Sequence, residues 1–286
     1  MNDLNKIINK SILSDDTVSF NIYSPDIAAK AKPGQFVVVI VNKEGERIPL
    51  TIADSDPDKG TLNLTILKRG TTTRLLAELK EGDVISDVAG PLGKNSEIEY
   101  FGTVAIIGGG VGIAPTLPII KAMKNTGNHV ISILGARNSD TLIFEDEIKK
   151  YSSEFYICTD DGSKGYKGFV SGFLTDYMLQ KQNKTIDRVV AIGPVLMMKA
   201  VCDVTRSAGI KTIVSLNPVM VDGTGMCGSC RVEVGGKTMF GCVDGPEFDG
   251  HLVDFNLLNA RLNVYCAEEK ESLTNYMEAH ECKLNK

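Results

Sequence analysis

The chain has 286 residues, of which 43% are hydrophobic and 23% charged, so it holds enough apolar material for two domains or three small ones. A net charge of −5, no Trp and only 6% aromatic residues argue against nucleic-acid binding, which needs basic surface and stacking rings. No run reaches the roughly 18–20 apolar residues that span a bilayer, and the first residues lack a signal-peptide core. We therefore expect a cytoplasmic protein without a membrane segment.

Short apolar runs, separated by turns rich in Pro, Gly and Asp, fill the chain from about residue 6 to residue 98. These runs are Val18–Tyr23, Phe36–Val41, Leu62–Leu67 and Val84–Val88. Strands at this spacing are typical of a small barrel or sandwich. The sequence thus predicts an all-β first domain over residues 1–98.

Two segments of this domain carry groups that suit a phosphate. The first is Arg47-Ile48-Pro49-Leu50-Thr51. A strand-borne guanidinium, a Pro that fixes φ and a Thr hydroxyl can together hold a pyrophosphate and touch a ring edge. A surface Arg on an edge strand is the simpler interpretation, and the segment alone does not separate the two.

The second segment is Gly70-Thr71-Thr72-Thr73, which comes directly before an apolar-periodic helix start. Backbone N–H groups at a helix N-terminus are well placed to bind a phosphate. Ordinary capping of the helix by Thr is the alternative for these hydroxyls.

From Thr103 the pattern changes, because short buried strands now alternate with helices, and this predicts a parallel sheet with right-handed crossovers over residues 99–215. The expected strands are Val104–Ile107, Val130–Leu134, Phe155–Cys158 and Arg188–Ile192. The expected helices are Pro115–Lys124, Glu145–Lys150, Gly172–Gln180 and Val195–Ala208.

A glycine-rich turn joins the first of these strands to its helix. The residues that we single out in it are Gly109, Gly110, Val111, Gly112, Ala114 and Pro115. A strand, a glycine turn and a helix N-terminus in this order form the phosphate cradle of nucleotide-binding folds. This indicates a nucleotide site in the second domain.

Ligands of such sheets bind beyond the carboxyl ends of the strands. Arg137, Asp160, Gly193 and Pro194 follow three of the expected strands. Arg137 suits a ribose or a phosphate, and a solvated surface Arg is the equally plain alternative.

Residues 216–286 carry the densest group of candidate metal ligands. The spacing is D-x4-C-x2-C-x11-C, formed by Asp222, Cys227, Cys230 and Cys242. Intervening glycines let the backbone curl and aim N–H groups at sulfur. A hairpin predicted at residues 231–240 returns the last Cys toward the first two. This spacing indicates an iron–sulfur cluster of the C-x4-C-x2-C…C kind, with Asp222 in the first ligand position.

Zinc and a redox dithiol are the alternatives for this loop. Structural zinc usually takes Cys or His at all four positions, and no His lies near the loop. A thioredoxin-like dithiol needs a helix directly after the pair, whereas residues 231–234 are expected to form a strand. The tail from residue 266 is expected to be a polar, solvated helix.

The chain thus carries, in this order, an all-β domain with an Arg/Thr segment, a nucleotide-binding α/β sheet and a cluster loop. In this it resembles the ferredoxin–NADP+ reductase-like flavoproteins that carry a C-terminal [2Fe-2S] cluster. The resemblance spans nearly the full length and is most specific at Arg47–Thr51, Gly109–Pro115, Gly193-Pro194 and the cluster loop. Within that superfamily it is similar to three subunits. They are the small subunit of electron-bifurcating NADH-dependent ferredoxin:NADP+ oxidoreductase, the β subunit of sulfide dehydrogenase and the electron-transfer subunit of dihydroorotate dehydrogenase.

Two departures from the superfamily pattern stand out. Arg47 lies one residue further from Thr51 than in the Arg-x-Tyr-Ser/Thr flavin motif, and no Tyr lies between them. The dihydroorotate-type subunits use four Cys, whereas Asp222 in the first position resembles the bifurcating and sulfide dehydrogenase members.

The resemblance implies a β-barrel FAD domain, then an α/β parallel-sheet domain for NAD(H) or NADP(H), then a small C-terminal iron–sulfur domain. It implies that Arg47 to Thr51 and Gly70 to Thr73 hold FAD, and that the glycine turn, Arg137, Asp160, Gly193 and Pro194 hold the dinucleotide. No catalytic acid or base is implied. Because no cluster of Arg is evident for a 2′-phosphate, NADH is favoured.

The function so implied is electron transfer between NAD(P)H, FAD and a [2Fe-2S] cluster, in a heterodimer with a larger flavin and iron–sulfur subunit. Ferredoxin would be reached through that partner. One alternative is the electron-transfer subunit of dihydroorotate dehydrogenase. Another, from a different class, is a zinc-stabilised nucleotide sensor without a redox role.

Overall fold

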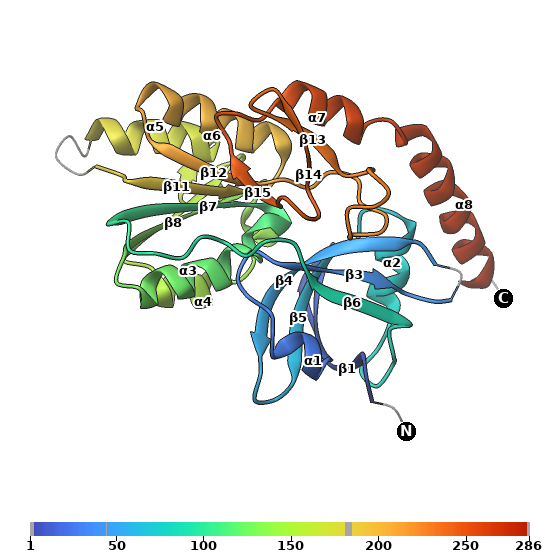
Figure 1. Cartoon of the computed structure of the whole chain (residues 1–286). Coiled ribbons are helices and arrows are strands. Elements are labelled where there is room, and N and C mark those ends of the chain that lie inside the picture. The colour runs from blue at the N-terminus through green and yellow to red at the C-terminus, as the bar shows by residue number, and fades with distance from the viewer. Residues whose placement is uncertain (1–2, 44, 181–184, 285–286) are drawn as a thin grey trace.

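The computed structural model describes residues 3–43, 45–180 and 185–284, with the backbone alone for residues 179–180 and 280–284. An antiparallel β-domain lies beside a parallel α/β-domain, and the C-terminal residues extend over both (Figure 1). This order of a barrel followed by an α/β sheet confirms the predicted fold class.

Six antiparallel strands form the first sheet in the order β1-β2-β5-β4-β3-β6. They are β1 (Lys6–Ser14), β2 (Thr17–Tyr23), β3 (Phe36–Ile40), β4 (Arg47–Asp56), β5 (Thr61–Leu67) and β6 (Asp87–Leu92), with helices α1 (Pro25–Ala28) and α2 (Thr71–Glu78) in the connections. A bridge between Lys6 and Val84 joins β1 to the segment before β6, so the sheet curves back on itself as a barrel. The strand expected at Val84–Val88 therefore begins only at Asp87, because residues 82–85 bond to the start of β1.

Alternation along β3 divides its side chains between two cores. Val37 and Val39 are buried inside the barrel. Phe36 and Val38 face outward, where they pack with buried residues of the C-terminal segment, among them Cys230. The outer face of β3 is thus the surface on which the cluster loop lies.

The second sheet has the order β10-β9-β8-β7-β11-β12-β15 and is parallel except for its last strand. Its strands are β7 (Thr103–Gly109), β8 (His129–Ala136), β9 (Glu154–Thr159), β10 (Tyr166–Lys167), β11 (Arg188–Ile192), β12 (Lys211–Ser215) and β15 (Glu247–Asp249). Helices α3 (Thr116–Asn125) and α4 (Glu145–Tyr151) cover one face, and α5 (Val170–Gln180) and α6 (Val195–Ser207) the other (Figure 1). Strand order reverses between β7 and β11, where such sheets bind ligands.

The C-terminal segment begins as an excursion from the edge of this sheet. It contains the hairpin β13 (Arg231–Val234) and β14 (Lys237–Phe240) and returns as β15, which pairs antiparallel with β12. The Leu216 N–H donates to the Pro246 carbonyl at 2.9 Å, so the two ends of the excursion lie side by side.

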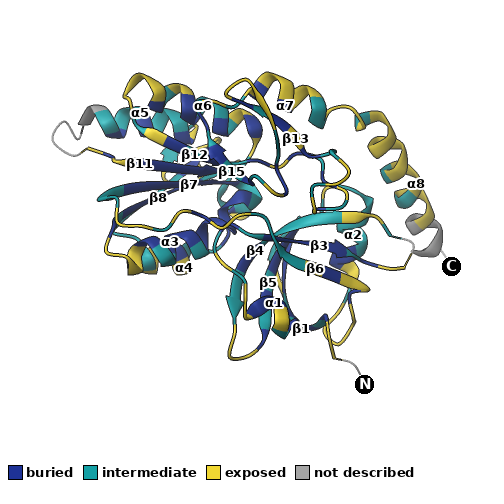
Figure 2. Cartoon of the chain, in the orientation of Figure 1, coloured by how far each residue is buried: buried dark blue, intermediate teal, exposed yellow. Residues whose placement is uncertain are grey.

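Two helices follow the excursion, α7 (Phe255–Leu262) and α8 (Cys266–Leu284). α8 runs past α2 of the barrel and is exposed along most of its described length (Figures 1 and 2). None of the helices in the described ranges combines the length and apolar character needed to cross a membrane.

A buried Arg fastens the barrel's exit segment to the second sheet. Arg188, the first residue of β11, has a side chain only 3% exposed and donates to the Glu97 carboxylate at 2.5 Å. Its guanidinium carbon lies 3.9 Å from the centre of the Phe101 ring. The hydrogen bond from Arg188 holds the pKa of Glu97 below its ordinary value.

We expect Glu97→Gln to lower the free energy of unfolding by about 1–2 kcal/mol at neutral pH, because it leaves the buried Arg188 charge without its counter-ion. A group with a lowered folded-state pKa stabilises above its unfolded pKa, and that stabilisation is lost as the pH falls through the folded-state value. The difference between wild type and variant should thus shrink as the pH falls below the ordinary pKa of a Glu carboxyl. Urea denaturation measures it, with Glu99→Gln as a control of equal charge change. Equal midpoints for the two variants would contradict the prediction.

Candidate functional site

The segment Arg47–Thr51 forms the start of β4, and alternation again decides which side chains are available to a ligand. Arg47, Pro49 and Thr51 share the outer face, since Ile48 and Leu50 pack against the barrel core. Leu50, expected from the sequence to help hold FAD, thus turns its side chain inward and leaves only its backbone to a ligand.

Pairing between β3 and β4 brings this outer strip beside the cluster loop. Thr51 lies opposite Phe36, and Pro49 lies opposite Val38. Directly opposed residues share a face of the sheet, with Cβ atoms about 4.5–5.5 Å apart. The strip is therefore one strand away from the residues on which the cluster loop packs.

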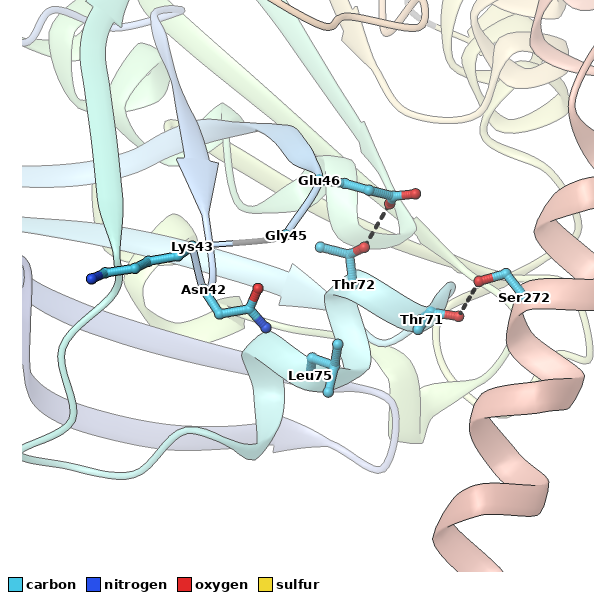
Figure 3. A pocket seen from close by; sticks show the side chains of 8 residues that line it. All are labelled: Asn42, Lys43, Gly45, Glu46, Thr71, Thr72, Leu75 and Ser272. Carbon is cyan, nitrogen blue, oxygen red and sulfur yellow. Dashed lines mark hydrogen bonds between the residues drawn. The ribbon is translucent and has the colours of Figure 1, made fainter.

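The turn at Gly70–Thr73 begins α2, and Gly70 brings no side chain to cap it. Thr73 Oγ1 accepts the N–H groups of Arg69 and Gly70, each at 3.0 Å, so its hydroxyl builds the turn. Thr72 donates to Glu46 at 2.6 Å, and the Thr71 hydroxyl lies 3.0 Å from that of Ser272 in α8 (Figure 3). The hydroxyls are thus engaged with protein groups, and the groups suited to an anion are the uncapped backbone N–H groups at the start of α2.

The glycine turn lies where the strand order of the second sheet reverses. Gly109 ends β7, and Gly110, Val111 and Gly112 belong to the short 3-10 helix Gly110–Ile113, followed by Ala114, Pro115 and α3. A Cβ on Gly112 would lie 2.5 Å from the Ile192 carbonyl oxygen and 2.8 Å from Gly193 Cα. Only glycine allows this approach, which brings the turn against Gly193-Pro194 at the end of β11.

Arg137 and Asp160 follow the neighbouring strands β8 and β9. Arg137 is 76% exposed and donates to the Asp16 carboxylate of the barrel at 3.3 Å. In the structure its partner is therefore a barrel residue, a contact that the sequence did not reveal because the two lie 121 positions apart. Asp160 is exposed, and its N–H donates to the Ala136 carbonyl.

Two of the three cysteine candidates already touch. Cys230 and Cys242 are buried, with their sulfur atoms 3.1 Å apart, whereas Cys227 is exposed. Backbone N–H groups point at two of the sulfurs: Ser229 donates to Cys227 at 3.5 Å, and Cys242 donates to Cys230 at 3.4 Å. Such N–H groups stabilise iron-bound thiolates.

The Asp222 carboxylate organises the loop from within. It accepts N–H groups from Thr224 at 3.0 Å, Cys227 at 2.9 Å and Met226 at 3.2 Å. These bonds lower the pKa of Asp222 to about 2, and the bond from Thr224 has the largest effect. The Asp222 carboxyl is therefore ionised at neutral pH. In the structure, Asp222 thus curls the backbone that carries Cys227.

This set of residues fits an iron–sulfur cluster by the chemistry of its donors: three thiols, one carboxylate and N–H groups aimed at sulfur. Within the described residues, no three His, Cys, Asp or Glu side chains converge on a single-ion site. A two-iron cluster shares its four ligands between two metal atoms, and the close pair Cys230 and Cys242 could serve one of them. Burial raises the pKa of the Cys242 thiol to about 12, and bound iron would supply the positive charge that a thiolate needs there.

Gly223 seats the loop on the barrel. Its φ is +76°, and a Cβ there would lie 2.8 Å from Leu92 Cδ1 and 2.9 Å from Val38 Cγ2. The loop therefore lies directly against β3 and β6, next to the strip on β4.

Three family models match the chain in the order that the structure shows. They are the oxidoreductase FAD-binding domain over residues 5–96, the oxidoreductase NAD-binding domain over residues 106–203, and the iron–sulfur cluster binding domain of dihydroorotate dehydrogenase B over residues 217–254. FAD, a nicotinamide dinucleotide and an iron–sulfur cluster are thus the cofactors of this chain. The third match favours iron–sulfur over the zinc alternative.

Relatives of known name match over nearly the whole chain. An electron transfer subunit homolog of dihydroorotate dehydrogenase B (NAD(+)) from Thermotoga maritima is 47% identical over 274 residues, which is 96% of each chain. The named electron transfer subunit from Fusobacterium nucleatum is 33% identical, over 82% of this chain and 92% of its own. Both are redox subunits by name.

Solved structures agree with these matches. A chain from the structure of NADH-dependent reduced ferredoxin-NADP oxidoreductase, studied for flavin-based electron bifurcation, superposes with a TM-score of 0.90 at 46% identity. The match covers 96% of this chain and 98% of that one. Phthalate dioxygenase reductase shares the fold, with a TM-score of 0.59 at 17% identity over 80% of this chain and 85% of its own.

Substitution of Gly223 tests how the loop is seated. We expect Gly223→Ala to lower the free energy of unfolding by about 2–3 kcal/mol more than Gly236→Ala, and to lower the iron content. Both glycines have positive φ, +76° and +73°, but a Cβ on Gly236 meets nothing within 4 Å. Denaturation curves and iron analysis measure the two variants, and equal losses would show that the loop does not press on the barrel.

Substitution of Asp222 tests whether its carboxylate binds iron or only shapes the loop. Asp222→Cys keeps a donor for iron, so we expect the cluster to be retained with an altered visible spectrum and reduction potential. Asp222→Asn keeps one of the two oxygens that accept loop N–H groups but removes the anionic ligand, so we expect iron to be lost. A wild-type spectrum in both variants would mean that Asp222 is not a ligand.

Proposed function

The chain belongs to the family of the dihydroorotate dehydrogenase B electron-transfer subunits and their homologues, and on this basis we propose its place in a larger enzyme. It passes electrons between NAD(H), FAD and a [2Fe-2S] cluster as the small subunit of an electron-bifurcating NADH-dependent ferredoxin:NADP+ oxidoreductase. A larger flavin and iron–sulfur subunit is its partner, and ferredoxin reacts through that partner.

The observation that carries the proposal is the adjacency of the flavin strip and the cluster loop. Arg47 and Thr51 lie on the outer face of β4, and the opposed β3 residue Phe36 packs with Cys230 and Cys242. One face of one strand pair therefore supports both redox sites. A bound flavin can accept two electrons together from a nicotinamide and release them one at a time to a metal centre.

We assign the remaining residues by what they can hold. Arg47 and the N–H groups at the start of α2 bind the FAD phosphates, with Pro49 and Thr51 along the flavin and Leu50 contributing backbone. The turn from Gly109 to Pro115, with Gly193-Pro194, binds the dinucleotide, and Arg137 and Asp160 line the sheet edge beside it. Asp222, Cys227, Cys230 and Cys242 hold the cluster. We divide the chain accordingly at 1–98, 99–215 and 216–286.

Two observations support the bifurcating assignment over the dihydroorotate-type subunit. The solved chain with a TM-score of 0.90 comes from a bifurcating enzyme and matches at both ends, covering 96% of this chain and 98% of that one. Asp222 also occupies the first ligand position, where the dihydroorotate type has Cys. The names of the curated relatives keep the dihydroorotate type as the second candidate, and the native partner decides between them.

The test is anaerobic purification of the native complex. We expect one FAD and about two irons per copy of this chain, flavin absorption that bleaches on addition of NADH, and a larger subunit with its own flavin and clusters. A barrel dehydrogenase with FMN as partner would favour the second candidate. A colourless zinc protein, or an isolated chain that completes the whole reaction unaided, would overturn the proposal.

A further inference from the structure

A hollow of about 560 Å³ lies in the barrel beside the start of α2, between elements that are far apart in sequence (Figure 3). One wall comes from described residues between β3 and β4, a second from the first turn of α2, and a third from the C-terminal helix α8. The lining residues are Asn42, Lys43, Gly45, Glu46, Thr71, Thr72, Leu75 and Ser272.

The wall from α8 lies outside all three matched domains. The FAD-binding match ends at residue 96 and the cluster-binding match at residue 254, so α8 follows both. α8 nevertheless binds the barrel: the Ser272 hydroxyl lies 3.0 Å from that of Thr71, and Tyr276 donates to Glu78. Figure 3 shows the Ser272 side chain directed at Thr71, at the start of α2.

The lining has the chemistry that recognises a nucleotide. The uncapped N–H groups at the start of α2 suit a phosphate, whereas the Lys43 ammonium points away from them (Figure 3). The Glu46 carboxylate and the Asn42 amide can accept hydrogen bonds from ribose hydroxyls or from an exocyclic amine. Leu75 supplies an apolar surface for a base.

We propose that this hollow takes the AMP half of FAD, and that α8 completes it, with Ser272 as a cofactor-binding residue contributed from beyond the FAD-binding domain. The inference rests on the proposed function, which places FAD on the barrel. The flavin ring then extends from α2 toward the outer strip of β4, since Glu46, in the lining, directly precedes Arg47.

This proposal implies that the binding of FAD and the docking of α8 on the barrel stabilise each other. α8 has 19 residues, and most of its described side chains are exposed (Figure 2). A helix that covers so little apolar surface has little packing to hold it in place. A ligand shared by α2 and α8 adds contacts that exist only when α8 is docked, so bound FAD should slow the opening of α8.

The test places opposite charges at one position of the full chain. Ser272→Glu should speed the release of FAD roughly tenfold and Ser272→Lys should slow it, because a unit charge near a phosphate changes its binding by this order. Thr274→Glu and Thr274→Lys are the controls, since residues two apart do not share a helix face and Thr274 does not line the hollow. FAD release is followed by flavin fluorescence, and hydrogen exchange of residues 266–279 is compared with and without FAD.

Faster release in Ser272→Glu, slower release in Ser272→Lys, and protection of α8 by FAD would support the inference. Equal release from the 272 and 274 variants, the same direction for both charges, or α8 exchange indifferent to FAD would overturn it. These failures concern α8 alone, because FAD would still be bound. If the wild-type chain binds no FAD, the proposed function itself fails.

Discussion

The antiparallel pairing of β3 with β4 is the constraint on which the rest of this molecule depends. Each strand has one face inside the barrel, so its alternate residues must face out. On β3 the outward residues are Phe36 and Val38, against which the cluster loop packs. On β4 the outward residues are Arg47, Pro49 and Thr51. A slip of one residue in either strand would turn one set into the barrel. The register therefore fixes how far the outer strip of β4 lies from the cluster loop, which are the two redox sites that we propose.

The second domain is tied to this barrel by a few polar contacts. Arg188 reaches from β11 to Glu97, Lys121 of α3 donates to Asp54 of β4 at 2.6 Å, and Arg137 reaches Asp16. Only the first of these involves a deeply buried charge. The side chain of Arg188 is thus shielded from water at this junction, whereas that of Arg137 is 76% exposed. Such a junction holds the glycine turn of β7 in a defined direction relative to the barrel.

The sequence predicted those features that depend on local spacing. Alternation of strands and helices predicted the second domain, and the hairpin pattern predicted that Cys242 returns toward the first two thiols. In the structure its sulfur lies 3.1 Å from that of Cys230. Contacts between residues that are distant in the sequence were missed. Arg137 and Asp16 are 121 positions apart, and Ser272 and Thr71 are 201 positions apart. β15 was missed because three residues show no periodicity. The inward turn of Leu50 was within reach, because the period of a strand already separates it from Arg47 and Thr51.

The hydrogen bond between Leu216 and Pro246 has a consequence for how this segment is inserted into the chain. A segment that leaves and re-enters a sheet at adjacent points adds no length to the path between β12 and β15. Insertions are tolerated best where the two ends of a segment already lie close together. The residues between Leu216 and Pro246 therefore form an insertion whose two ends lie side by side at the edge of the sheet. The segment therefore joins the sheet through a single closed connection, although its Val232 and Val234 still pack into the core of the second domain.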